Sequence, residues 1–277
     1  MIARFFRLFA FSLTAANPLV AGLVLADFRC EGLREAPQVD TTAPRFSWRL
    51  DTDARDVRQT AWQLRVSETD GAGKTIGKPV ESERVGSDAT QWNIIPGFTP
   101  AARTSYVWQV RAWDNHGNAS GWSEPQRFGT GLIGSKWPAD WIGDGRNVPL
   151  YQTSPARHFR NSFKVEKPPV RARLYVSARG LVEPWLNGRL VTDDKFIPGW
   201  PDYRRRVFYV AFDVTDLVRS GDNTLGMMLG DGWFSGTMIP RHQYGQQPML
   251  SAFLDLTAAD GTVTTITTGE TWRWSDS

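Results

Sequence analysis

Acidic side chains are the first candidates for chemistry, because two carboxylates about 5–9.5 Å apart can hydrolyse a bond held between them. Asp193 and Asp194 are neighbours, and neighbouring side chains on a strand point to opposite faces. We therefore interpret this pair as solvated turn acids. Asp231 stands between two glycines ahead of Trp233, and it is the acid for which we predict a ligand role. The other acids considered for such chemistry are Glu183 and Asp202.

Histidine, cysteine and glycine motifs point to no metal or cofactor. His116, His158 and His242 are far apart in the sequence and lack the spacing of a helical zinc site. Cys30 is the single cysteine, so it has no partner for an internal disulfide. Residues 230–235 share glycines with a dinucleotide-binding loop, but no amphipathic helix follows them, so we predict a tight turn.

Aromatic residues form the most ligand-like group. The chain has 13 tryptophans among 277 residues, and several fall in loops rather than in alternating strands. Aromatic rings stack on the apolar faces of sugars, while polar groups at the rim bind hydroxyls. We predict that these loop residues form a carbohydrate site or a domain interface. The candidates are Trp200, Tyr203, Asp231, Trp233 and Phe234, with His242 and Tyr244 close to them in sequence.

Short alternating strands must position these residues. Residues 61–67 place Trp62, Leu64 and Val66 on one face, and residues 106–113 repeat the pattern with Tyr106 and Trp108. Helical periodicity is nearly absent, so we predict an all-β protein with two β-sandwich domains. Residues 27–130 have the size of one immunoglobulin-like sandwich. A second β domain is expected over residues 158–277.

The segment between these domains has a different composition. Residues 131–157 are rich in Gly, Pro and Trp and show no clear periodicity, so we predict a linker. Within it, residues 137–143 are expected to pack into the domain junction and residues 144–155 to form a loop. In the second domain, Asn187-Gly188 lies between apolar runs and predicts a hairpin, because both turn residues must accept positive φ. Residues 249–257 are expected to pair with residues 262–268.

The N-terminus predicts an export signal over residues 1–26. Arg4 and Arg7 precede a short apolar run, and small residues follow, with cleavage expected after Ala26 or after Ala16. The alternative is that residues 19–28 form the first strand. A signal would make the protein periplasmic or extracellular. Beyond the N-terminus no apolar run is long enough for a stable membrane span, and a net charge of +3 does not indicate nucleic-acid binding.

Several motifs resemble known families. Residues 104–115 and 122–125 resemble the last strands of a fibronectin type III domain, in which Tyr106 is the corner tyrosine. Across almost the whole chain, the motifs together resemble the N-terminal region of bacterial α-L-rhamnosidases of glycoside hydrolase family 78. The matching stretches are residues 28–31, 44–48, 58–62, 108–114, 122–125, 141–143, 172–176, 186–188, 198–203, 209–217 and 230–234.

The resemblance implies a modular enzyme whose catalytic acids lie on an (α/α)-barrel that has no counterpart in this sequence. It also implies that the second domain is a jelly-roll, galactose-binding-like sandwich. We therefore expect the non-catalytic N-terminal portion of an enzyme that hydrolyses terminal α-L-rhamnose, with the catalytic domain and rhamnose-containing glycans as partners. The second domain looks truncated at Ser277. The alternative is a free-standing carbohydrate-binding or adhesion module.

Overall fold

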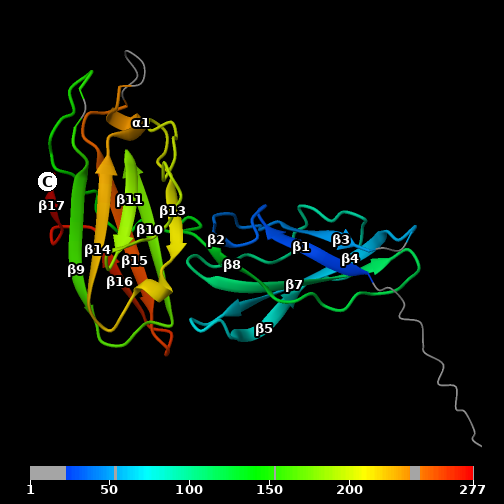
Figure 1. Ribbon diagram of the computed structural model, residues 1–277. Coiled ribbons are helices and arrows are strands. Elements are labelled where there is room, and N and C mark those ends of the chain that lie inside the picture. The colour runs from blue at the N-terminus through cyan, green and yellow to red at the C-terminus, as the bar shows by residue number, and fades with distance from the viewer. Residues whose placement is uncertain (1–22, 53–54, 153, 238–243, 277) are drawn as a thin grey trace, which may run out of the picture.

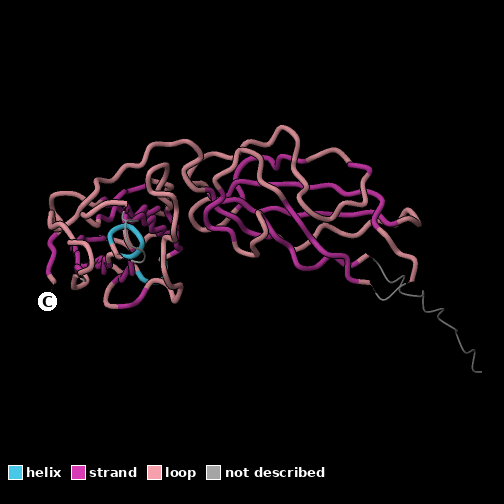
Figure 2. The backbone as a smooth tube through the Cα atoms, turned by 90° about the horizontal axis from the view of Figure 1, so that it is seen from above, coloured by secondary structure: helices cyan, strands magenta, loops and turns pink. Residues whose placement is uncertain are grey.

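The computed structural model describes residues 23–52, 55–152, 154–237 and 244–276, and it shows two β units (Figure 1). The first unit meets the second where β2 and β8 approach β13. Viewed from above, the chain is strand and loop throughout the first unit, and its helical turns belong to the second (Figure 2). The predicted all-β class is therefore confirmed.

The first unit is a sandwich of two sheets. One sheet pairs β1 with β3, and the other has the order β2-β8-β7-β4-β5 with β6 beside β4. Its core includes Phe46, Trp48, Trp62 and Trp108. The strands are β1 Val24–Cys30, β2 Ala36–Val39, β3 Phe46–Asp51, β4 Gln59–Thr69, β5 Thr75–Glu81, β6 Val85–Gly86, β7 Ser105–Asp114 and β8 Gln126–Thr130.

The alternation of apolar and polar residues in the sequence predicts the two central strands of this unit, β4 and β7. Tyr106 and Trp108 are buried on β7, as predicted, and successive residues of that strand alternate between buried and half-buried. The hydroxyl oxygen of Tyr106 accepts a hydrogen bond from the Ala101 N–H at 2.8 Å. This contact confirms the predicted corner tyrosine. On the opposite face, the Arg65 Nε donates to Gln109 across the β4–β7 pair at 2.9 Å.

The second unit is also a sandwich. Its sheets have the orders β13-β10-β15-β16 and β12-β11-β14-β9-β17. Leu174, Leu186, Leu229 and Leu254 are fully buried between them. The elements are β9 Arg157–Val165, β10 Arg171–Arg179, β11 Leu181–Leu186, β12 Arg189–Leu190, β13 Tyr209–Asp213, η1 Thr215–Leu217, β14 Gly221–Gly230, α1 Gly232–Ser235, β15 Met249–Thr257, β16 Val263–Thr267 and β17 Arg273–Ser275.

Turn chemistry in this unit is confirmed at two places and corrected at one. Asn187 and Gly188 both have positive φ, of 53° and 77°, as the predicted hairpin requires. β15 pairs with β16, as predicted for residues 249–257 and 262–268. The predicted tight turn after Gly230 is instead a single helical turn, α1, because the Asp231 carbonyl accepts the Ser235 N–H at 3.2 Å.

Apart from Arg157, which begins β9, no described residue of the expected linker belongs to a strand, yet the segment is packed against the second unit. Ile142 forms a β-bridge with Leu250, and Val148 is fully buried. Trp137 contacts Phe253 and Tyr209 of the second unit, with ring centroids 5.0 and 5.5 Å apart. Residues 131–157 therefore form an outer layer of the second unit.

Charged residues of β10 close the junction between the two sandwiches. The Arg173 side chain is 7% exposed, and its Nη1 donates to the Thr130 carbonyl at 3.2 Å. Gly129 makes this insertion possible, because a Cβ there would lie 2.4 Å from the Arg173 Nη2. The Arg103 Nη1 reaches back from the first unit to Asp255 at 3.1 Å. The polar face of β10 is thus a domain contact.

The predicted signal lies mostly outside the described residues. Its last residues belong to β1, where Val24, Leu25 and Ala26 pair with Asp51, Leu50 and Arg49. From Val24 onward the alternative holds, because this segment is a strand. Among the described residues, no helix is long and apolar enough to cross a membrane.

Candidate functional site

Three aromatic rings form an exposed surface that we call the aromatic platform, consisting of Phe196, Trp200 and Trp233. The indoles of Trp200 and Trp233 stack with centroids 5.3 Å apart and ring planes 1° from parallel. Phe196 lies 5.7 Å from Trp233. Trp200 is 51% exposed and Phe196 is 65% exposed. Trp233, which contacts both of the other rings, is half-buried.

Two segments bring the platform together. Trp233 is carried by α1, which lies at one end of the second sandwich (Figure 1). Phe196 and Trp200 come from residues 191–208, between β12 and β13. Pairing of β11 with β14 brings α1 and this segment close, since the Val182 N–H donates to the Ile197 carbonyl at 2.9 Å.

Tyr203 and Phe234, which are close in sequence to Trp200 and Trp233, form a second aromatic contact. Phe234 is 8% exposed and meets Tyr203 edge-on at 5.2 Å. Tyr203 also meets Tyr244 edge-on at 5.2 Å. Burial raises the pKa of the Tyr203 hydroxyl, which donates weakly to the Gly199 carbonyl at 3.4 Å. Among the candidate residues, Trp200 is exposed, Tyr203 and Trp233 are half-buried and Phe234 is buried, while His242 lies outside the described residues.

Asp231 belongs to a buried ion network. The Arg157 Nη1 lies 2.8 Å from its carboxylate, and the Arg157 Nε lies 2.8 Å from the carboxylate of Asp144. The side chains of Arg157 and Asp144 are 1% and 0% exposed. Burial alone would raise the pKa of Asp144, but hydrogen bonds from Arg146 and Arg157 outweigh burial and lower it. Asp231 thus helps fasten residues 144–157 to the second sandwich.

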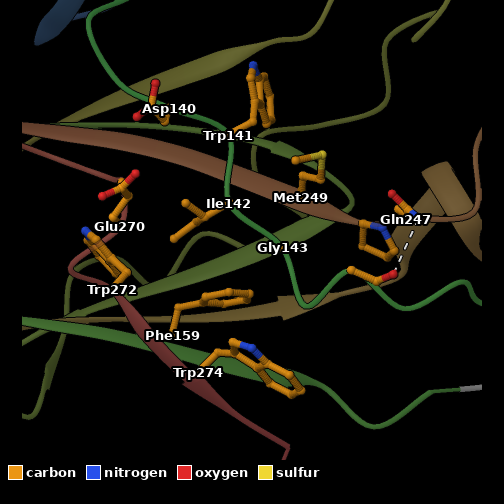
Figure 3. Close-up of a pocket in the computed structure, with 13 residues that line it drawn as sticks. Asp140, Trp141, Ile142, Gly143, Phe159, Gln247, Met249, Glu270, Trp272 and Trp274 are labelled. Carbon is orange, nitrogen blue, oxygen red and sulfur yellow. Dashed lines mark hydrogen bonds between the residues drawn. The ribbon is translucent and has the colours of Figure 1, made fainter.

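A groove lies at the open edge between the two sheets of the second sandwich (Figure 3). We call it the tryptophan groove. It has a volume of about 460 Å³. The sequence analysis did not predict this groove, because its tryptophans come from segments far apart in the sequence. The high tryptophan content of residues 137–141 and 272–274 was the only sequence feature that pointed to it. The lining residues are Asp140, Trp141, Ile142, Gly143, Gly145, Phe159, Gln247, Pro248, Met249, Gly269, Glu270, Trp272 and Trp274.

The carboxyl groups with a resolved pKa shift are held in their charged form. A carboxylic acid that donates a proton at neutral pH needs a raised pKa. Within the described part of the chain, each carboxyl with a resolved shift has a lowered pKa: Asp27, Glu31, Asp114, Asp144, Asp202, Asp260 and Asp276.

Metal and thiol chemistry have no support in the same residues. The described ranges contain no cluster of three or more His, Cys, Asp or Glu side chains that could hold a metal ion. Burial raises the pKa of the Cys30 thiol far above its usual value, which leaves it protonated and unreactive.

Comparisons with known protein families match each of the two β units separately. Residues 25–134 match a family described as Rha78A-like, N-terminal immunoglobulin domain, and residues 167–277 match the α-L-rhamnosidase N-terminal domain. An α-L-rhamnosidase of Alteromonas sp. (strain LOR) is 33% identical over 245 residues, covering 85% of this chain and 27% of that protein. One from Streptomyces avermitilis is 40% identical over 189 residues, covering 66% of this chain and 18% of that protein.

Solved structures of α-L-rhamnosidases also resemble this chain. The α-L-rhamnosidase of Aspergillus terreus superimposes with a TM-score of 0.82 at 28% identity, covering 92% of this chain and 29% of that one. The enzyme from Dictyoglumus thermophilum gives 0.79 at 28% identity, covering 92% and 30%. The chain therefore spans less than a third of the length of these relatives. It belongs to the α-L-rhamnosidase family and contains the two β domains found at that family's N-terminus.

Proposed function

We propose that this chain forms the non-catalytic N-terminal portion of an exported α-L-rhamnosidase, and that the complete enzyme hydrolyses terminal α-L-rhamnosides. One observation carries the proposal: the similarity to the Aspergillus terreus enzyme covers 92% of this chain but 29% of that one.

The aromatic platform serves, in this proposal, as the contact for the catalytic domain. Exposed apolar patches of several large side chains usually mark a partner or ligand surface. The platform rings contact one another within this chain, with Trp233 stacked on Trp200 and tilted against Phe196, so the surface is already assembled before any partner arrives. Its occupant is the part of the enzyme that the relatives carry in addition to these two domains.

An activity assay tests the proposal. The 277-residue chain is assayed with an aryl α-L-rhamnoside, beside a protein expressed from the gene together with the coding region that follows it. We expect no turnover by the chain alone and turnover by the longer protein. Turnover by the chain alone, abolished by one Asp or Glu substitution, would contradict it. A gene with no barrel-coding sequence downstream would favour a free-standing carbohydrate-binding module, the reading that the tryptophan groove supports.

Export is part of the proposal, and β1 constrains it. Cleavage after Ala26 would remove Val24, Leu25 and Ala26, which pair with β3. Cleavage after Ala16 would leave β1 complete. N-terminal sequencing of the secreted protein should therefore find a start upstream of Val24. A mature chain that starts at Asp27 would show that the first sandwich does not need these three pairs.

A further inference from the structure

We propose that the tryptophan groove binds one pyranose ring of a neutral sugar. The groove is separate from the aromatic platform. It lies between β15 on one side and β9 and β17 on the other, with residues 140–145 along it and residues 269–272 at one end (Figure 3). Its volume of about 460 Å³ falls within the range of roughly 300–1,000 Å³ that is usual for small-molecule sites.

The walls of the groove suit the apolar face of a sugar. Ile142, Phe159 and Met249 supply an apolar floor, and Trp274 borders it beside Phe159 (Figure 3). Trp274 is 43% exposed, although β17 holds it in register opposite Phe159. The C–H groups on one face of a pyranose pack on such surfaces, since aromatic rings combine a large contact area with a fixed plane.

Arginines hold the indoles in place without enclosing them. The guanidinium of Arg146 lies 4.8 Å from the centroid of Trp274, and that of Arg179 lies 5.1 Å from the centroid of Trp141. A cation over one face of an indole is attracted by the electrons of the ring and leaves the second face for another partner. Trp272 is fixed differently, because its Nε1 donates to the Thr267 carbonyl at 3.0 Å.

Polar groups stand at the two ends of the groove. Asp140 and Glu270 lie at the end beside Trp272, and Gln247 lies at the opposite end (Figure 3). Neither carboxylate forms an ion pair with any described residue, so both remain free to accept hydrogen bonds from sugar hydroxyls. The Gln247 amide is oriented by donation to Asn147 at 3.0 Å.

The same carboxylates select the class of sugar. Two negative charges at one end disfavour the carboxylate of a uronic acid or the sulfate of a sulfated sugar, and the guanidiniums of Arg146 and Arg179 against Trp274 and Trp141 disfavour a cationic amino sugar. A neutral ligand avoids both repulsions. A 6-deoxy sugar fits best, because its methyl group adds apolar area to lie on the floor while its hydroxyls reach the acids. We choose L-rhamnose as the probe; this choice rests on the proposed function, whereas the neutral-sugar class rests on the groove itself.

Binding is tested on the 277-residue chain by titration calorimetry with L-rhamnose, and with D-glucuronate as the acidic comparison. We expect one site for L-rhamnose and at least about tenfold weaker binding of D-glucuronate, since unfavourable charge pairs strongly suppress wrong partners. Trp274→Ala should weaken L-rhamnose binding about tenfold or more, as expected for an aromatic anchor. Glu270→Gln should weaken it less, because the amide keeps one acceptor oxygen.

Trp200→Ala is the matched control, because it removes an indole of similar exposure, 51% against 43% for Trp274, from the aromatic platform. It should leave L-rhamnose binding unchanged. Absence of heat and of any tryptophan fluorescence change with L-rhamnose would overturn the proposal. Loss of binding in Trp200→Ala, with binding retained in Trp274→Ala, would place the sugar on the platform and would also overturn it. The result does not depend on hydrolysis, so an inactive longer protein would contradict the proposed function and leave this measurement intact.

Discussion

Two aromatic regions of the second sandwich have opposite surroundings. In the junction cluster, Tyr175 and Phe253 stack 4.3 Å apart and are 1% and 0% exposed. In the aromatic platform, Trp200 and Trp233 stack 5.3 Å apart, but Trp200 is 51% exposed. Both regions contain parallel rings in close contact. They differ in what lies over them, because residues 132–139 cover the junction cluster.

Hydrogen bonds follow the same division. At the junction, the Trp137 Nε1 donates to Ser251 at 2.6 Å, and the Tyr209 hydroxyl accepts from the Leu132 N–H at 2.9 Å while donating to Asp40. On the platform, the indole nitrogens of Trp200 and Trp233 have no hydrogen-bond partner among the described residues. Among the described residues, the chain thus covers one aromatic surface itself and leaves the other exposed.

The largest expected effect tests the junction. Phe253→Ala should destabilise the chain by about 3–5 kcal/mol, because truncating a fully buried ring removes contacts and leaves a cavity. Urea unfolding followed by tryptophan fluorescence measures this loss. Phe196→Ala on the platform is the control, and it should stay within about 0.5 kcal/mol of wild type. Equal losses in the two variants would remove the contrast between the regions.

A second test breaks the buried ion network that fastens residues 144–157. Arg157→Met should destabilise the chain by about 2–3 kcal/mol, because the buried Asp144 loses one of its two cationic partners and Asp231 loses its ion pair. Thermal unfolding with and without the substitution measures the effect. Arg204→Met removes an exposed ion pair to Asp202 and should change stability far less. An unchanged melting temperature in Arg157→Met would show that the network contributes nothing.

Acid should weaken the same network. The pKa of Asp144 is lowered in the folded protein, so the unfolded state binds its proton more tightly and the carboxylate stabilises the fold above the ordinary pKa of 3.8. This contribution is lost as the pH falls below that value towards the folded pKa. Asp144→Asn should therefore be less stable than wild type at pH 7, with the difference shrinking between about pH 5 and pH 2. A difference that stays constant over this range would contradict the assignment.

Local sequence patterns were sufficient to predict the structure where the interacting residues are close together in the sequence. The alternation around Trp108, the corner role of Tyr106 and the Asn187-Gly188 hairpin were predictable, because each depends on strand period or turn geometry within a few residues. The family resemblance supplied the order of the two domains.

Long-range contacts explain what could not be predicted. Arg157 and Asp231 are 74 residues apart, so nothing local indicated that Asp231 would be paired rather than open to a ligand. The alternation of Arg171, Arg173 and Tyr175 resembles an ordinary solvent face, yet this face is buried against the first sandwich. The tryptophan groove depends in the same way on β17 pairing with β9. Each of these features requires knowing which segments meet.

The smallest expected effect sharpens the comparison most. Trp233→Ala should cost this chain less than about 1.5 kcal/mol, because it loses stacking with Trp200 and Phe196 without opening a cavity in the core. In the longer protein the same change should cost more, because the ring would then be covered by the catalytic domain. Paired melting curves of the two proteins measure the difference. A drop of more than about 10 °C in this chain alone would correspond to a core residue at the usual 2–4 °C per kcal/mol. That result would make Trp233 equivalent to Phe253, and the platform would no longer be a surface reserved for a partner.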